Sequence, residues 1–130
     1  MLLSFISAEA IALGDAVTIS TTTSGQIIPA HPSGIPSATV VGVAVDAVSA
    51  GTLCRVVSDA GAQVFSGLNP GHRYYVSPSG AYAVDYDTFI VEFNQIGVSG
   101  SYLTQIGTAI SPTTLKVSPV EPRYVVSGAL

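Results

Sequence analysis

The stretch Ala16-Val17-Thr18-Ile19-Ser20 decides the fold class of this chain. Val17 and Ile19 alternate with smaller or polar residues, and this period of two is typical of a β-strand that buries one face and exposes the other. The turn-forming residues Thr23-Ser24-Gly25 follow closely, as they do between short antiparallel strands. The same alternation returns at residues 114–117. Both segments are therefore expected to be strands of an antiparallel sheet with one buried and one solvated face.

Turn signals recur along the rest of the chain, separated by segments rich in Val, Ile, Thr and Tyr. They are SAG at 49–51, NPG at 69–71 and SPSG at 77–80. Helical periodicity is almost absent, and residues 7–13 fit a short helix and an extended segment equally well. The sequence thus predicts an all-β fold, a small antiparallel β-barrel or sandwich with at least about eight strands and under about a tenth of its residues in α-helix.

A further strand is expected at residues 89–94. Phe89, Val91 and Phe93 alternate there with residues 90, 92 and 94. On a strand, every second side chain points to the same face. We therefore expect Phe89, Val91 and Phe93 to form one buried face, in the core or in a subunit interface.

Two stretches resemble each other within the chain, VGVAV at 41–45 and IGTAI at 106–110. In each, one face carries branched residues and the other carries only Gly and Ala. A strand with such a small face lets another backbone approach closely. The likeness fits a duplicated unit, and it fits two unrelated valine-rich strands equally well.

The composition of the chain favours a domain that is covered by partners. Its 130 residues and 13.2 kDa suit a single domain. Hydrophobic residues make up 48 % and charged residues only 9 %, where about 25 % charged is usual. A membrane helix needs about 20 consecutive apolar residues, and Ser, Thr, Gly or Pro interrupts every apolar run well before that. We therefore expect partner proteins, and no membrane, to cover much of the surface.

The charge pattern argues against nucleic-acid binding. The net charge is −4, and the four Lys and Arg residues stand singly along the chain. Proteins that bind nucleic acid neutralise several phosphates together, which scattered cations do not do. The apolar N-terminus, MLLSFI at 1–6, has no basic region before it and is short for a signal peptide. We expect it to belong to the mature protein and the protein to be made in the cytoplasm.

The sequence offers no pattern of catalytic or cofactor-binding residues. His31 and His72 lack the spacing of paired metal ligands. Asp85 and Asp87 could share one side of a strand, as a calcium site needs, but no calcium-binding loop follows and a solvated strand end is the favoured interpretation. Cys54 lies within a predicted strand, where a lone cysteine is usually a small core residue. We expect no enzymatic activity, no metal and no cofactor, and a small hydrolase or isomerase is strongly disfavoured.

The interface candidates are apolar residues near the two ends of the chain and aromatic residues, because tyrosine buries its ring while its hydroxyl stays hydrated. They are Leu2, Leu3, Phe5, Ile6, Phe89, Phe93, Tyr102, Tyr124, Val125 and Val126. An apolar, β-prone terminus can add a strand to the sheet edge of a neighbour. The alternative is that both ends complete the sheet of their own domain. A carbohydrate-binding face would also use aromatic residues, although the absence of Trp weakens that hypothesis.

Five stretches, taken in order, resemble a known module. They are AEAIALGDAV at 8–17, VVGVA at 40–44, AGTLCRV at 50–56, GLNPGHRYYVS at 67–77 and QIGTAISPTTL at 105–115. This succession is similar to a β-rich module of tailed-phage virion proteins, most of all the capsid decoration (cement) proteins. It covers residues 8–117 of a single domain, 1–130, and leaves 1–7 and 118–130 as extended terminal arms.

The resemblance implies a structural virion protein. Such a protein decorates and stabilises the capsid by binding the outside of the major capsid protein lattice. It would be a homotrimer located on the outer capsid surface. The alternative is a module of a head fibre or tail fibre that binds a glycan or protein of the host surface.

Overall fold

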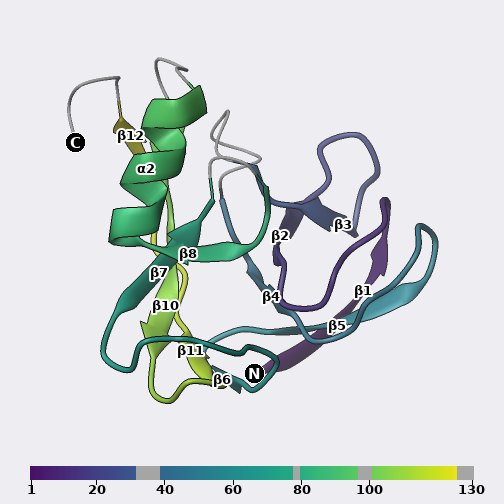
Figure 1. The fold of residues 1–130 in the computed structure, drawn as a ribbon. Coiled ribbons are helices and arrows are strands. Elements are labelled where there is room, and N and C mark those ends of the chain that lie inside the picture. The colour runs from purple at the N-terminus through teal and green to yellow at the C-terminus, as the bar shows by residue number, and fades with distance from the viewer. Residues whose placement is uncertain (32–38, 78–79, 97–100, 126–130) are drawn as a thin grey trace.

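Five short strands close into a barrel in the N-terminal half of the chain (Figure 1). They are β1 (Leu2–Ser7), β2 (Ala16–Ile19), β3 (Gln26–Pro29), β4 (Gly42–Ala44) and β5 (Leu53–Val57), in the order β1-β3-β2-β4-β5. Neighbouring strands are antiparallel except β1 and β3, which run parallel. The computed structural model describes residues 1–31, 39–77, 80–96 and 101–125.

A second sheet of five strands packs against the barrel. It consists of β6 (Gly61–Ala62), β7 (Arg73–Val76), β8 (Ala83–Asp85), β10 (Gln105–Ala109) and β11 (Leu115–Val117), in the order β6-β11-β10-β7-β8. All of its pairs are antiparallel. Two further strands, β9 (Ser101–Leu103) and β12 (Arg123–Val125), pair with each other, and helix α2 spans Tyr86–Ile96.

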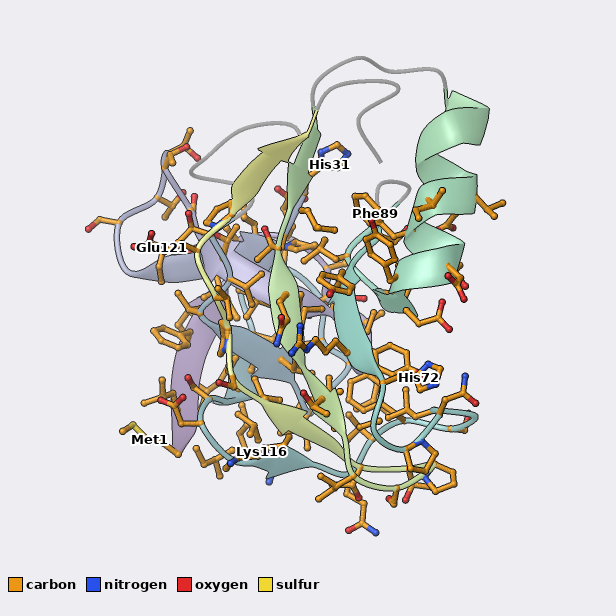
Figure 2. The ribbon with its side chains drawn as sticks, turned by 90° about the vertical axis from the view of Figure 1, so that its left-hand side faces the viewer. Met1, His31, His72, Phe89, Lys116 and Glu121 are labelled. Atoms are coloured by element: carbon orange, nitrogen blue, oxygen red, sulfur yellow. The ribbon has the colours of Figure 1, made fainter. Side chains whose placement is uncertain are left out.

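These elements form three layers, namely barrel, second sheet and helix, with three apolar clusters within and between them. One cluster fills the barrel and includes Val17, Ile27 and Val56. The largest lies where strands β2, β4 and β5 of the barrel meet the second sheet. Its members are Ala16, Ala30, Val40, Val43, Val57, Ala62, Leu68, Tyr74, Val76, Ile106, Ala109, Leu115 and Val117. The third holds α2 on the side of the second sheet that faces away from the barrel, as Figures 1 and 2 show.

The expected all-β class is confirmed, with twelve strands in the described part of the chain. The close backbone approach expected of the two Gly/Ala faces is also confirmed. A Cβ on Gly42 would stand 2.5 Å from the Val57 carbonyl oxygen, and one on Gly107 would overlap the Lys116 carbonyl oxygen of the paired strand. Each glycine therefore allows a strand pairing that no larger residue fits.

Residues 89–94 are helical, so the strand expected there is wrong. The Asp85 carboxylate accepts a hydrogen bond from the backbone N–H of Thr88 at 2.9 Å and caps the first turn of α2. On a helix, residues two apart point in different directions. Phe89 is accordingly buried against the second sheet, whereas Val91 is 54 % exposed. The side chain of Phe93 lies outside the described part of the structure.

The carboxylate of Glu92 links the middle of α2 to residues between β7 and β8 through hydrogen bonds. Glu92 accepts a hydrogen bond from the Ser77 hydroxyl at 2.8 Å and another from the Tyr82 hydroxyl at 2.6 Å. Ser77 is fully buried, so its hydroxyl needs such a partner. The helix is thus held by a polar clamp as well as by Phe89.

The N-terminal segment 1–7 is a barrel strand, so the expected arm is wrong there. Strand β1 pairs with β5 from Leu2↔Val57 to Ile6↔Leu53 and with β3 at Ser7↔Ile27. The backbones of Met1 and Ser58 exchange two further hydrogen bonds. An apolar, β-prone end satisfies its backbone groups within its own sheet when an edge of that sheet is available. The alternative, that this end completes its own domain, is therefore correct.

The C-terminal segment also pairs within the domain as far as it is described. The N–H of Ser118 donates to the Ile106 carbonyl at 2.7 Å, and that of Val120 donates to the Gln105 carbonyl at 3.0 Å. Strand β12 then pairs with β9. Residues 118–125 therefore do not form a free arm, and 126–130 lie outside the described residues. The segment 7–13 is not helical either, because β1 ends at Ser7 and Ile11 forms a lone bridge with Val48.

Candidate functional site

Strand β1 divides the N-terminal interface candidates between two sides. Phe5 packs on the cluster inside the barrel, and Leu3 shares its side of the strand. Leu2 and Ile6 point outward and are 56 % and 39 % exposed. Of these four residues, only Leu2 and Ile6 therefore have exposed side chains.

The remaining candidates do not join this surface. Phe89, a residue of α2, is completely buried between the helix and the second sheet. The side chains of Tyr102, Tyr124 and Val125 lie outside the described part of the structure, although the backbone of all three belongs to the β9–β12 pair. Val126 lies outside the described residues.

Strand β5 adds a third exposed apolar residue beside Ile6. Leu53 is directly opposite Ile6 in the β1–β5 ladder and is 56 % exposed. The next pair on the same side is Ser4 and Arg55. We call this surface the outer β1–β5 face; it consists of Leu2, Ser4, Ile6, Leu53 and Arg55. Its backbone is fixed by five consecutive register positions, so its side chains stand on a rigid support.

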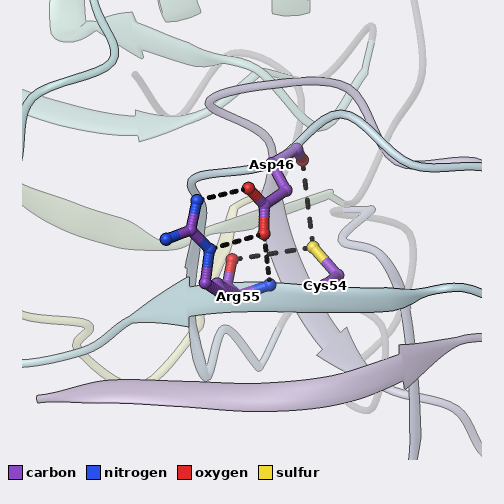
Figure 3. Close-up of polar contacts among 3 residues, drawn as sticks. All are labelled: Asp46, Cys54 and Arg55. Carbon is purple, nitrogen blue, oxygen red and sulfur yellow. Dashed lines mark hydrogen bonds and ion pairs between the residues drawn. The ribbon is translucent and has the colours of Figure 1, made fainter.

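The positive charge of Arg55 in this face is paired with the neighbouring carboxylate of Asp46 (Figure 3). Asp46 accepts hydrogen bonds from the Arg55 Nε at 2.9 Å, from its terminal nitrogen at 2.7 Å and from its backbone N–H at 2.9 Å. The side-chain bonds from Arg55, reinforced by its backbone N–H, lower the pKa of Asp46 to about 2. The guanidinium is therefore already neutralised and does not demand a charged partner.

Cys54 points into the barrel, on the side of β5 opposite Arg55. Its thiol lies near the Asp46 carbonyl oxygen at 3.9 Å and the Arg55 carbonyl oxygen at 3.6 Å (Figure 3). Burial raises the pKa of the Cys54 thiol. A buried thiol that resists ionisation is a packing residue and not a nucleophile.

The polar residues singled out in the sequence occupy other positions. Asp85 ends β8 and caps α2, while Asp87 lies in the first turn of that helix, so the two do not share one side of a strand. The N–H of Thr88 holds the pKa of Asp85 below its usual value. Within the described ranges, no group of three or more His, Cys, Asp and Glu residues gathers as metal ligands would.

Sequence reasoning missed Leu53. Residues 53–57 are apolar on both sides of the strand apart from Arg55, so alternation alone does not tell which side faces the barrel. The charged Arg55 was the available signal, because it marks the outer side that Leu53 shares.

The chain matches no known protein-family model and no curated protein sequence. In the described part of the chain, no helix is long and apolar enough to cross a membrane.

Proposed function

We propose that this chain is a structural protein of a phage virion, located on the outer capsid surface. It binds the outside of the major capsid protein lattice and stabilises it, and the outer β1–β5 face is the surface that binds. This role requires no catalysis, no cofactor and no contact with nucleic acid or membrane.

The observation that carries the proposal is the exposed apolar side chains on a rigid sheet. Leu2, Ile6 and Leu53 stand together on paired strands, and the only charge between them is neutralised by Asp46. Apolar side chains that gather on a fixed surface are typical of protein interaction sites. A face with a compensated charge suits a partner surface that is itself largely uncharged.

Composition and family resemblance support the location. Only 9 % of the residues are charged, and the net charge of −4 gives no basic patch that would draw the chain to packaged DNA. The five ordered stretches in residues 8–117 are similar to capsid decoration proteins. The homotrimer that we propose rests on the same resemblance. Sedimentation of the free protein at micromolar concentration tests it. A monomer would contradict self-association in solution.

Charge insertion into the face tests the proposal. In the Ile6→Glu/Leu53→Glu variant both side chains lie outside the barrel, so we expect the fold to be retained. Two carboxylates buried against an apolar partner surface are costly, and occupancy of capsids assembled without this chain should fall by at least about tenfold. Deleting the first five residues is a poorer test, because the deletion removes most of strand β1.

The control is Val91→Glu, which introduces one carboxylate, where the double variant introduces two, at a comparably exposed position on α2. We expect this variant to decorate capsids like the parent chain. Equal occupancy for the double variant and the parent would contradict the proposed face. Equal loss for Val91→Glu would show that added charge alone weakens binding.

A further inference from the structure

A polar hollow opens where β7 meets the first turn of α2. Its volume is about 300 Å³, and its lining residues come from two segments of the chain, 71–75 and 85–87. They are Gly71, His72, Arg73, Tyr75, Asp85, Tyr86 and Asp87. Figure 2 shows His72 near the end of α2 where the helix begins. A hollow of this size stands at the lower limit for small-molecule sites.

Two tyrosine rings form a preorganised aromatic corner in the hollow. The ring centroids of Tyr75 and Tyr86 lie 6.1 Å apart, with their planes at 60°. Behind Tyr75 stands the buried ring of Phe89 at 6.5 Å, which fixes the orientation of Tyr75. Tyr86 is exposed. The corner therefore offers ring surface to a ligand without having to rearrange.

The mixed charges around this corner favour neither an anionic nor a cationic ligand. Asp85 and Asp87 line the same hollow as Arg73, so a phosphate or carboxylate would meet two like charges. A cationic ligand would meet the Arg73 guanidinium, which forms no ion pair with another described residue. A wholly apolar ligand would leave these charged groups without hydration. What remains is a neutral ligand that has both hydroxyl groups and an apolar face.

A second, smaller hollow adjoins the first. Its volume is about 90 Å³, and it shares Arg73 and Tyr75 with the first hollow. The other lining residues are Leu103, Gln105, Val120 and Glu121. Tyr75 and Arg73 thus belong to both hollows, and the amide of Gln105 adds a donor and an acceptor. We call the two hollows together the β7–α2 groove.

We infer that the β7–α2 groove binds a neutral oligosaccharide. A sugar ring presents one apolar C–H face, which stacks on Tyr75 or Tyr86, and an edge of hydroxyls that donate to Asp85 and Asp87 and accept from Arg73. The second hollow, at about 90 Å³, receives a hydroxyl substituent of an adjoining sugar unit beside Gln105. This site is independent of the proposed capsid-binding face. Helix α2, whose first turn lines the groove, lies on the side of the second sheet away from the barrel (Figure 1), so a chain attached through its barrel leaves the groove accessible.

The test is a titration of isotope-labelled protein followed by amide NMR, with maltotriose, lactose and chitotriose as neutral probes. Binding by at least one probe at millimolar concentration is expected to shift amides of residues 71–75, 85–87 and 103–105. Tyr86→Ala and Arg73→Gln should each weaken that binding about tenfold. Both positions are exposed, so the amide spectrum should otherwise stay that of the folded chain.

The control is Val91→Ala, an exposed position on the same helix that lines neither hollow; it should bind like the parent chain. Inorganic phosphate and putrescine serve as anionic and cationic probes, and neither should shift these amides. The inference is overturned if none of the three saccharides shifts them, if either charged probe shifts them more strongly, or if Tyr86→Ala binds unchanged. Capsid binding is not measured in this experiment, so its outcome leaves the proposed function untouched.

Discussion

Two residues on the same side of strand β5 have opposite environments. Val57 is 8 % exposed, because the second sheet covers it together with Ala16 and Val43. Leu53 lies four residues earlier on the same outer side and is largely exposed, beside Ile6. The outside of the barrel is therefore apolar over a wider area than the rest of the chain covers. The comparison teaches that the covered half builds the domain, and the uncovered half is the surface that we propose for a partner.

The largest effect is expected from a change that disrupts the second sheet, which covers the part of the barrel surface around Val57. Gly107→Ala would place a Cβ against the Lys116 carbonyl, so the β10–β11 ladder has to separate. We expect a loss of about 4 kcal/mol or more in the free energy of unfolding, or no folded protein. Gly51→Ala is the control, because nothing lies within 4 Å of its added Cβ and only its positive φ is unfavourable, at about 1 kcal/mol. Urea unfolding measures both, and similar losses would contradict the close approach of the strands.

The helix layer offers the same contrast between a covered and an uncovered residue. Phe89→Ala removes a fully buried ring that supports both α2 and Tyr75, and should cost about 3–5 kcal/mol. Val91→Ala changes an exposed position two residues later and should stay within about 0.5 kcal/mol of the parent. Thermal and urea unfolding distinguish them. Equal effects at the two positions would argue for the strand that the sequence predicted, in which both share one face.

The comparison on β5 itself is sharpened by two alanine variants. Val57→Ala loses contacts with the second sheet and should cost about 2 kcal/mol. Leu53→Ala should change the stability of the free chain by less than about 0.5 kcal/mol. Chemical denaturation of each variant gives the difference. A large loss for Leu53→Ala in the free protein would mean that this residue stabilises the domain and is not kept for a partner.

The smallest effect concerns the ion pair in the uncovered half. The pKa of Asp46 falls from its ordinary 3.8 to about 2 in the folded chain. A group with a lowered folded pKa stabilises the fold above its unfolded pKa, and that contribution disappears as the pH falls through the folded pKa. Asp46→Asn should therefore be slightly less stable than the parent at pH 7, and the gap should close between pH 3.8 and about 2. Because the pair is exposed, the difference is small. A gap that persists at pH 2 would contradict this assignment.

Sequence patterns located strands β2, β4, β10 and β11, because alternation and turn chemistry act over a few residues. They also identified Gly42 and Gly107 as places of close approach. They failed at residues 89–94, because Phe89 and Phe93 satisfy the spacing of a strand and also that of a helix, which Asp85 caps. The N-terminal strand was misplaced because its partner β5 lies about 50 residues along the chain. Barrel closure depends on such distant pairings, which local patterns do not contain.

The central claim is that the uncovered half of the barrel surface contacts the capsid. A cryo-electron microscopy reconstruction of capsids decorated with this chain tests it most directly, because it shows which side of the domain meets the lattice. We predict that Ile6 and Leu53 are buried against the major capsid protein, while α2 and the β7–α2 groove face outward. A reconstruction with α2 against the lattice and Leu53 in solvent would contradict the account.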